Sequence, residues 1–203
     1  MNFEVVDNVF QTVTLLLSAA AAFVLSVMKR SRVLMMLSFG YISFMMGTLF
    51  YVLHIVILGY NPKIFYVSEV SWLAAYLFFF SIALLISEKT KFYLPGAVVA
   101  LLVYAVSFTV KIFGPSYITS TAFALLVAGI TYLSVCGIKK HGAKNSAAEI
   151  MMLACVLLQI ALYIVSVFMT DYTSFNLYFA VDIAFTLSMT ALLPIFCRRE
   201  SAQ

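Results

Sequence analysis

The apolar positions of this chain fall into seven long runs, and the short segments between them hold most of the charged residues. The runs are residues 9–28, 33–59, 68–87, 92–113, 117–137, 150–170 and 177–197. A helix rises 1.5 Å per residue, so about twenty apolar residues cross a hydrocarbon core roughly 30 Å thick. The pattern predicts an all-α polytopic membrane protein, a seven-transmembrane helix bundle in which residues 1–203 form a single transmembrane domain.

The basic residues are divided unevenly between the two sets of connecting segments. Of the 12 Lys and Arg residues, only two lie on one side of the predicted bundle: Lys63, after the second run, and Lys111, near the outer end of the fourth run. The others follow runs one, three, five and seven: Lys29, Arg30, Arg32, Lys89, Lys91, Lys139, Lys140, Lys144, Arg198 and Arg199. Because cytoplasmic loops carry the excess of Lys and Arg, we expect the N-terminus outside and the C-terminus inside. A bacterial cytoplasmic (inner) membrane is the expected location.

Composition supports a membrane protein and limits the other classes. Hydrophobic residues make up 65% of the chain and charged residues 10%, too little charge to cover a soluble domain of this length. The net charge of +4 does not indicate nucleic-acid binding, because the basic residues lie in loops beside the bilayer. Glu4 and Asp7, with no Lys or Arg before them, argue against a cleavable signal peptide. We expect the three cysteines to be free thiols rather than disulfides or metal ligands.

Several polar and aromatic residues fall at one depth, in the outer third of the predicted bundle. His54 lies near the outer end of run two, Glu69 and Trp72 at the start of run three, and Asp182 near the start of run seven. Tyrosines and a glutamine continue this set toward the midplane. If runs two, three, six and seven are neighbours, one outward-facing ligand pocket would be lined by His54, Glu69, Trp72, Asp182, Tyr51, Tyr76, Gln159 and Tyr163.

Each of these residues also has a purely structural interpretation. Asp182 could bond a neighbouring hydroxyl, and His54 could join helices by a hydrogen bond. Glu69 could be an interfacial residue favoured by the helix dipole, and Trp72 an interface anchor. The Gln159 and Tyr163 pair could be interhelical bonding. Ionisable groups inside a span usually mark a functional interior, so both interpretations stay open.

The inventory of side chains excludes some chemistry. A retinal Schiff base needs a buried lysine in the last span, and the seventh run has none before Arg198. A zinc-dependent intramembrane hydrolase needs about three ligands at one depth, whereas His54 is the only histidine within a predicted span. There is no P-loop, dinucleotide motif or nucleophile elbow. We therefore expect no metal and no cofactor.

Two segments resemble the lysoplasmalogenase-like (YhhN) family of small polytopic membrane proteins. They run from Ser43 to Phe50 (SFMMGTLF) and from Trp72 to Phe79 (WLAAYLFF), together with a later acid, Asp182. The family has a Ser-x-x-Gly-Asp-type motif in an early span, and Thr48 stands here in place of that aspartate. This chain also has seven predicted spans, whereas proteins of the family usually have eight. The resemblance implies hydrolysis of lipid ether or ester bonds, and the departure at Thr48 puts that activity in doubt.

Three functions follow from these patterns. The first is a non-enzymatic protein that binds a small or lipid-like ligand in an outward-facing pocket, for sensing or presentation to a partner. The second is a membrane-embedded hydrolase in which Asp182 and Glu69 act as acid and base and His54 assists. The third is a small-solute transporter, favoured if the bundle is pseudo-symmetric. A cytoplasmic or membrane partner would contact Lys139, Lys140, Lys144, Arg198 and Arg199.

Overall fold

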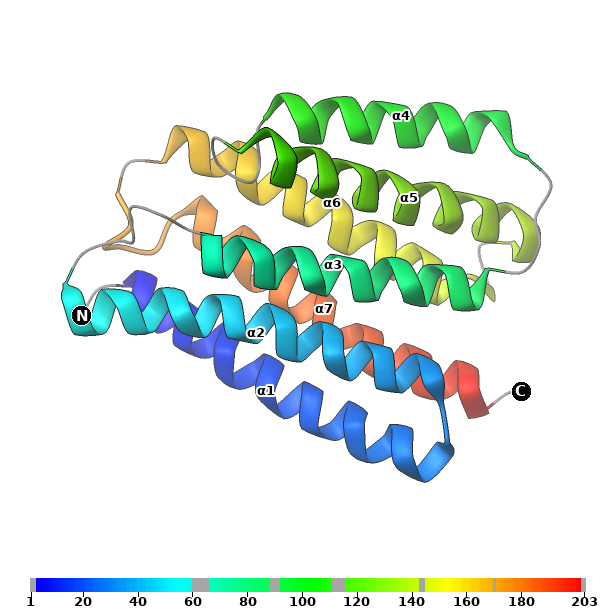
Figure 1. Ribbon diagram of the computed structural model, residues 1–203, viewed down its shortest axis with the longest axis horizontal. Helices are drawn as coiled ribbons and strands as arrows, with labels where there is room; N and C mark the ends of the chain where they lie inside the picture. Colours follow the sequence, from blue (N-terminus) through cyan, green and yellow to red (C-terminus); the bar gives the residue numbers. More distant parts are fainter. Residues whose placement is uncertain are drawn as a thin grey trace.

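The computed structural model describes residues 3–59, 66–87, 92–110, 116–142, 145–169 and 171–201. These residues form seven α-helices and no strand, which confirms the predicted all-α polytopic bundle (Figure 1). The helices are α1 (Phe3–Lys29), α2 (Arg32–Leu58), α3 (Tyr66–Ile86), α4 (Leu94–Thr109), α5 (Tyr117–His141), α6 (Ala147–Phe168) and α7 (Leu177–Ser201).

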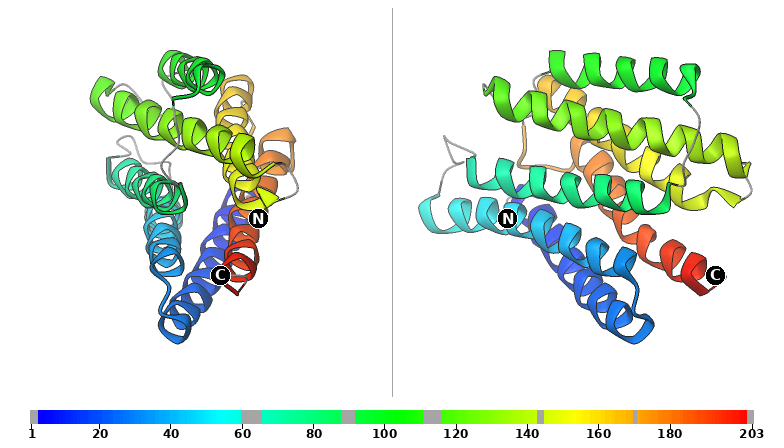
Figure 2. Two further views of the ribbon diagram at one scale, coloured as in Figure 1. Left: turned by 90° about the vertical axis from the view of Figure 1, so that its right-hand side faces the viewer. Right: turned by 45° about the vertical axis from the view of Figure 1, so that its right-hand side comes forward.

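Six of the helices close into a ring. Each contacts the next in the order α1, α2, α3, α5, α6, α7, and α7 returns to α1. The remaining helix, α4, lies outside this ring against α5 (Figures 1 and 2). Runs two, three, six and seven were expected to surround the pocket, and the ring adds α1 between α2 and α7.

The six ring helices each have the length and composition of a membrane span. Within the described residues, all six are long and apolar enough to cross a membrane, whereas α4 is a shorter apolar helix of 16 residues. Large apolar side chains such as Leu17, Val56, Leu101 and Leu157 lie exposed on the outside of the bundle. Exposed apolar area on this scale is unfavourable in water and is expected against lipid tails.

Several helix ends differ from the boundaries expected from the apolar runs. Helix α1 begins at Phe3 rather than at residue 9, so Glu4 and Asp7 lie inside the helix and are buried. The expected start at residue 9 was too late because it was placed at the first long apolar run, and the acidic residues Glu4 and Asp7 precede that run. Helix α4 ends at Thr109, short of the expected residue 113, and Lys111 lies outside the described residues. Lys63, Lys89, Lys91 and Lys144 lie outside them too.

The two ends of the bundle differ in charge. At the end where α1, α5 and α7 finish, here called the basic end, lie Lys29, Arg30, Lys139 and Arg198. At the opposite, acidic end lie Glu4, Glu69 and Asp171, and the chain termini lie at opposite ends (Figure 1).

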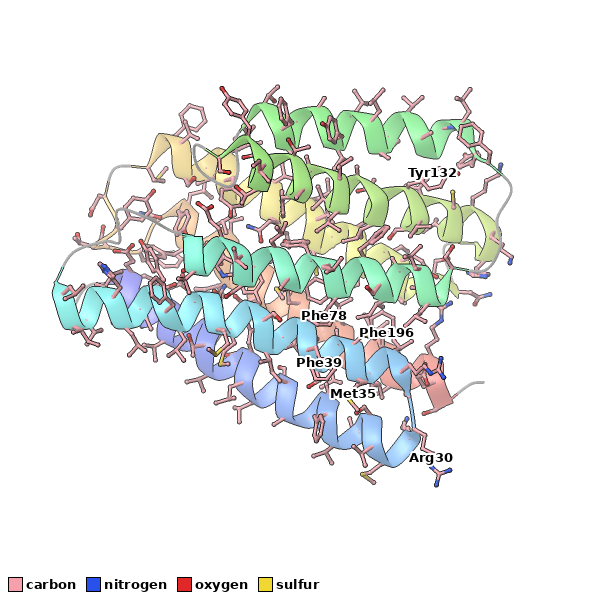
Figure 3. The ribbon with its side chains drawn as sticks, in the orientation of Figure 1. Arg30, Met35, Phe39, Phe78, Tyr132 and Phe196 are labelled. Carbon is pink, nitrogen blue, oxygen red and sulfur yellow. The ribbon has the colours of Figure 1, made fainter. Side chains whose placement is uncertain are left out.

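Side chains of α2 contact both α3 and α7 away from the acidic end. Phe39 of α2, which is exposed, lies against Phe78 of α3 with ring centroids 5.6 Å apart. Figure 3 labels both residues. The hydroxyl of Tyr41 donates to the carbonyl oxygen of Met189 at 2.6 Å, which ties α2 to α7. Buried polar groups in hydrocarbon need such partners. The Tyr41–Met189 bond therefore holds α2 and α7 together within the bundle.

Candidate functional site

A partly open cavity of about 290 Å³ lies at the acidic end, between α1, α2, α3, α6 and α7. Its volume is at the lower end of the range for small-molecule sites, which runs from about 300 to 1,000 Å³. The lining residues are Glu4, Asn8, Gln11, Phe44, Tyr51, Glu69, Trp72, Gln159, Leu162, Tyr163, Ser166, Tyr178 and Asp182. The cavity thus combines carboxylates, amides and aromatic rings, and none of these described lining residues is Lys, Arg or His.

A hydrogen-bond network centred on Gln11 forms one wall. Its amide nitrogen Nε2 donates to Oδ1 of Asp182 at 3.0 Å and to Oγ1 of Thr186 at 2.9 Å. Its carbonyl oxygen Oε1 accepts from the hydroxyl of Thr48 at 2.7 Å. All four side chains are buried. The network joins α1, α2 and α7 and fixes the position of the Asp182 carboxyl group.

Asp7 extends this network on α1. Its carboxyl group lies beside that of Asp182 on α7. Asp7 is buried, and its Oδ2 has no hydrogen-bond partner among the described residues.

The other two carboxyl groups of the cavity differ in their partners. The hydroxyl of Tyr51 donates to Oε1 of Glu4 at 2.7 Å. Glu69, in the first turn of α3, is 5% exposed, and its Oε2 is buried with no hydrogen-bond partner in the described part of the chain. A buried acceptor that lacks a donor is costly. Glu69 is therefore the lining group with the clearest capacity for a further partner.

Backbone contacts hold α1 at this end. The amide nitrogens of Phe3 and Glu4 donate to the carbonyl oxygens of Thr173 and Tyr172, at 3.2 and 3.3 Å. The first N–H groups of a helix have no partner within it, and the segment between α6 and α7 supplies two here. The start of α1 is thereby fixed beside the cavity.

Six of the eight residues proposed from the sequence line this cavity: Tyr51, Glu69, Trp72, Gln159, Tyr163 and Asp182. Tyr76 lies below it, buried, with its hydroxyl donating to Oε1 of Gln159 at 2.8 Å. His54 is not a lining residue; it is half-buried, with its ring centroid 6.3 Å from that of Phe50. The set of Asp182, Glu69 and His54 required by a hydrolase is thus only partly gathered around the cavity.

The sequence interpretation did not assign α1 to the site. Glu4, Asn8 and Gln11 are spaced by four and three residues, the spacing of one helix face, and all three line the cavity. That spacing was visible in the sequence, but Glu4 was placed outside the first span. Phe44 and Leu162 carried no signal that separates a lining residue from ordinary apolar packing.

At the basic end, an ion pair connects four helices. Nη1 of Arg199 lies 2.8 Å from Oε1 of Glu149, and Nη2 of Arg199 donates to the carbonyl oxygen of Ile86 at 3.5 Å. Nδ1 of His141 lies 3.8 Å from the same Glu149 oxygen. The ends of α3, α5 and α7 thus meet the start of α6.

Two of the basic residues expected to contact a partner make contacts within the chain. Arg199 pairs with Glu149, and Nζ of Lys139 lies 3.7 Å from the ring centroid of Tyr93. Arg198 is exposed. Lys144 lies outside the described residues.

The described residues contain no group of three or more His, Cys, Asp or Glu side chains arranged to hold a metal ion. The cysteines Cys136, Cys155 and Cys197 are free thiols. Comparison of the chain with protein-family models, with curated proteins and with solved structures finds no match.

Proposed function

We propose that this integral membrane protein binds a small ligand in the cavity at its acidic end, for sensing or for presentation to a partner. The observation that carries the proposal is Glu69, whose buried Oε2 lacks a hydrogen-bond partner among the described residues beside a partly open cavity. The positions of Lys29, Lys139 and Arg198 at the other end favour access from outside the cytoplasm.

The side of access can be tested by chemical labelling. In a variant with Cys136, Cys155 and Cys197 replaced by alanine, Ser166→Cys places one thiol in the cavity lining. A membrane-impermeant maleimide added to intact cells should label it. The matched control is Ser134→Cys. Ser134 is buried in α5 toward the basic end, and a thiol there should stay unlabelled. Absence of labelling at position 166 in the folded variant would contradict an outward-facing cavity.

Binding itself can be followed without an added probe. The chain contains one tryptophan, Trp72, and it lines the cavity. A ligand that enters should change the fluorescence of this residue saturably and raise the unfolding temperature, because binding to the folded state alone stabilises it. A cavity that accepts labels but no ligand from a chemically diverse set would contradict the binding function.

The ring order favours a transporter as the second candidate. A two-fold axis along the membrane normal would exchange α1–α3 with α5–α7. The six neighbouring pairs of the ring are compatible with this exchange, whereas the additional contact of α2 with α7 is not matched to the same extent between α6 and α3 in the described residues. Parallel repeats of this kind occur in transporters, with the substrate site between the halves. The cavity is lined from both α1–α3 and α6–α7. Uptake of a bound ligand into proteoliposomes would distinguish transport from binding alone.

The hydrolase implied by the lysoplasmalogenase-like resemblance has less support. Thr48, at the position of the family's aspartate, donates its hydroxyl to Gln11, and His54 does not line the cavity. Turnover of a lysoplasmalogen by the purified protein, lost in Asp182→Asn, would favour this function over the other two.

A further inference from the structure

We propose that the ligand of this cavity is an organic cation, with an ammonium group held near Glu69 and an apolar body against the aromatic wall. This inference rests on the binding function proposed above and adds the chemical class of the ligand. The chemistry is shared by free amines and by the ammonium headgroups of lipids.

The first argument is the sign of the charge. The cavity is lined by the carboxyl groups of Glu4, Glu69 and Asp182, and Asp7 lies directly beside Asp182. None of the described lining residues carries a basic side chain. An anionic ligand would meet repulsion from every ionised group among the described lining residues, whereas a cation would be attracted.

The second argument comes from the partners that each carboxyl group already has. Tyr51 donates to Glu4, and Gln11 donates to Asp182. Oε2 of Glu69 is the buried lining oxygen that has no donor among the described residues. Burying a carboxylate is unfavourable unless a cation or hydrogen-bond donors compensate. An ammonium group placed beside Glu69 would supply that compensation.

The third argument is the aromatic character of the same wall. Trp72 lies one turn beyond Glu69 on α3, and its ring centroid is 6.0 Å from that of Phe44 across the α2–α3 interface. Tyr163 and Tyr178 also line the cavity. Aromatic faces attract ammonium ions and tolerate apolar groups, the combination that recognises quaternary ammonium ligands. A carboxylate beside aromatic rings favours an organic cation over a hydrated metal ion.

The cavity size restricts the ligand further. At about 290 Å³, the space suits a small molecule rather than a whole two-chain lipid. A lipid could place only its headgroup here, and its phosphate would then lie near the acidic wall. We therefore assign the free organic cation as the ligand and make the lipid headgroup a separate arm of the test.

The test uses probes of matched shape and different charge, read by Trp72 fluorescence on the full chain in detergent or nanodiscs. Choline and benzyltrimethylammonium are the cations, and 3,3-dimethylbutan-1-ol is the uncharged carbon analogue of choline. Phosphocholine represents the lipid headgroup, and benzoate is the anion. We expect saturable fluorescence changes with a cation, at least tenfold weaker binding of its uncharged analogue, and no response to benzoate.

The variants assign the effect to Glu69. Glu69→Gln keeps the size of the side chain but removes its charge, and it should weaken cation binding at least tenfold. Asp171→Asn removes a carboxylate at the same end that is exposed and outside the cavity lining, so it should leave binding unchanged. Equal weakening in both variants would mean that only the general charge of this end matters, and would overturn the assignment.

The outcomes separate the two proposals. Equal binding of choline and its uncharged analogue, tighter binding of benzoate, or binding of phosphocholine alone would overturn the free organic cation while leaving ligand binding intact. If no cation changes the fluorescence of Trp72 while the maleimide still labels Ser166→Cys from outside, the cation class is also rejected. Absence of labelling at position 166 would reject the outward-facing cavity itself.

Discussion

A Cβ atom at Gly47 would lie 2.6 Å from Nε1 of Trp72 and 3.0 Å from the carbonyl oxygen of Ser68. Helices α2 and α3 therefore touch at a point that only glycine permits. The hydroxyl of Ser68 donates to the carbonyl oxygen of Gly47 at 2.9 Å and fixes the same contact. Small residues allow close helix approach in membranes, and here the approach sets the position of a cavity-lining indole.

Gly47→Ala should therefore displace Trp72 and separate the two helices. Overpacking of this kind costs about 1–3 kcal/mol, and we expect a lower unfolding temperature together with a changed emission spectrum of Trp72. Gly40→Ala is the matched control on the same helix, because its Cβ would meet only side-chain atoms, the nearest being Cε1 of Phe79 at 3.1 Å. A Gly40→Ala variant less stable than Gly47→Ala would contradict this explanation.

Gln11→Leu should destabilise the bundle through the partners that it leaves behind. Thr48, Asp182 and Thr186 each lose a hydrogen bond to Gln11 while they stay buried. A buried polar group without its partner costs about 1–3 kcal/mol, so the total should exceed that of a single lost bond. Chemical unfolding in mixed micelles would measure the difference from the unmodified chain.

The matched control is Ser18→Ala on the same helix. Within the described residues, the hydroxyl of Ser18 donates to the carbonyl oxygen of Thr14 in its own helix, so its removal should change stability little. Combining Gln11→Leu with Thr48→Val should be less harmful than the sum of the two changes, since both act on one bond. Strict additivity would show that the Gln11–Thr48 contact does not form.

The sequence was sufficient to predict the helices and part of the candidate site. Apolar runs of bilayer length are a strong signal, and the shared depth of Glu69, Trp72 and Asp182 follows from counting residues along them. Counting residues along the runs does not show which helices are neighbours. The position of α1 between α2 and α7 was therefore not predicted. His54 shows the same limit, since its depth was evident but its absence from the cavity lining was not.

The position of α4 could not be predicted for a related reason. Its apolar run is similar in composition to the others, and a sequential ring of seven helices was equally compatible with the sequence. Nζ of Lys139 lies 3.7 Å from the ring centroid of Tyr93, the residue just before α4. The amide of Tyr93 donates to the hydroxyl of Tyr132 of α5 at 3.4 Å, and Figure 3 labels Tyr132. Contacts of this kind place α4 on α5 and are specific to the folded chain.

Arg199→Met should be more harmful than the same change at its neighbour Arg198. Arg199 is paired with Glu149, whose side chain is 3% exposed, whereas Arg198 is exposed. Removing one member of a buried pair costs about 3–5 kcal/mol, and we expect the lower part of that range because Arg199 itself is 24% exposed. Adding Glu149→Gln to Arg199→Met should restore part of the loss, and the unfolding free energies of the three variants test this.

Asp171 should give the fold a pH-dependent contribution at the acidic end. Hydrogen bonds from the hydroxyl and amide of Thr173 and from the hydroxyl of Ser174 lower the pKa of this exposed carboxyl group. Stabilisation from a lowered pKa is present above the unfolded value of about 3.9 and is lost as the pH falls through the folded value. Thermal unfolding should therefore separate the unmodified chain from Asp171→Asn at neutral pH, and the difference should shrink below about pH 4. A difference independent of pH would contradict the role of the charge.

The last prediction concerns the path of α4. Ile86 at the end of α3, His141 at the end of α5 and Arg199 near the end of α7 all meet at the basic end through Glu149 and Arg199. Since α3 finishes at the same end as α5, α5 must begin at the other end, and the chain between them has to return. Helix α4 is 16 residues long, about 24 Å at 1.5 Å per residue, so a few flanking residues complete a crossing of roughly 30 Å. Reporters placed before Met1 and after Val110 should therefore both be external, and one placed after Gln203 should be cytoplasmic. A cytoplasmic signal after Val110 would mean that α4 does not cross, and termini on the same side would mean an even number of spans.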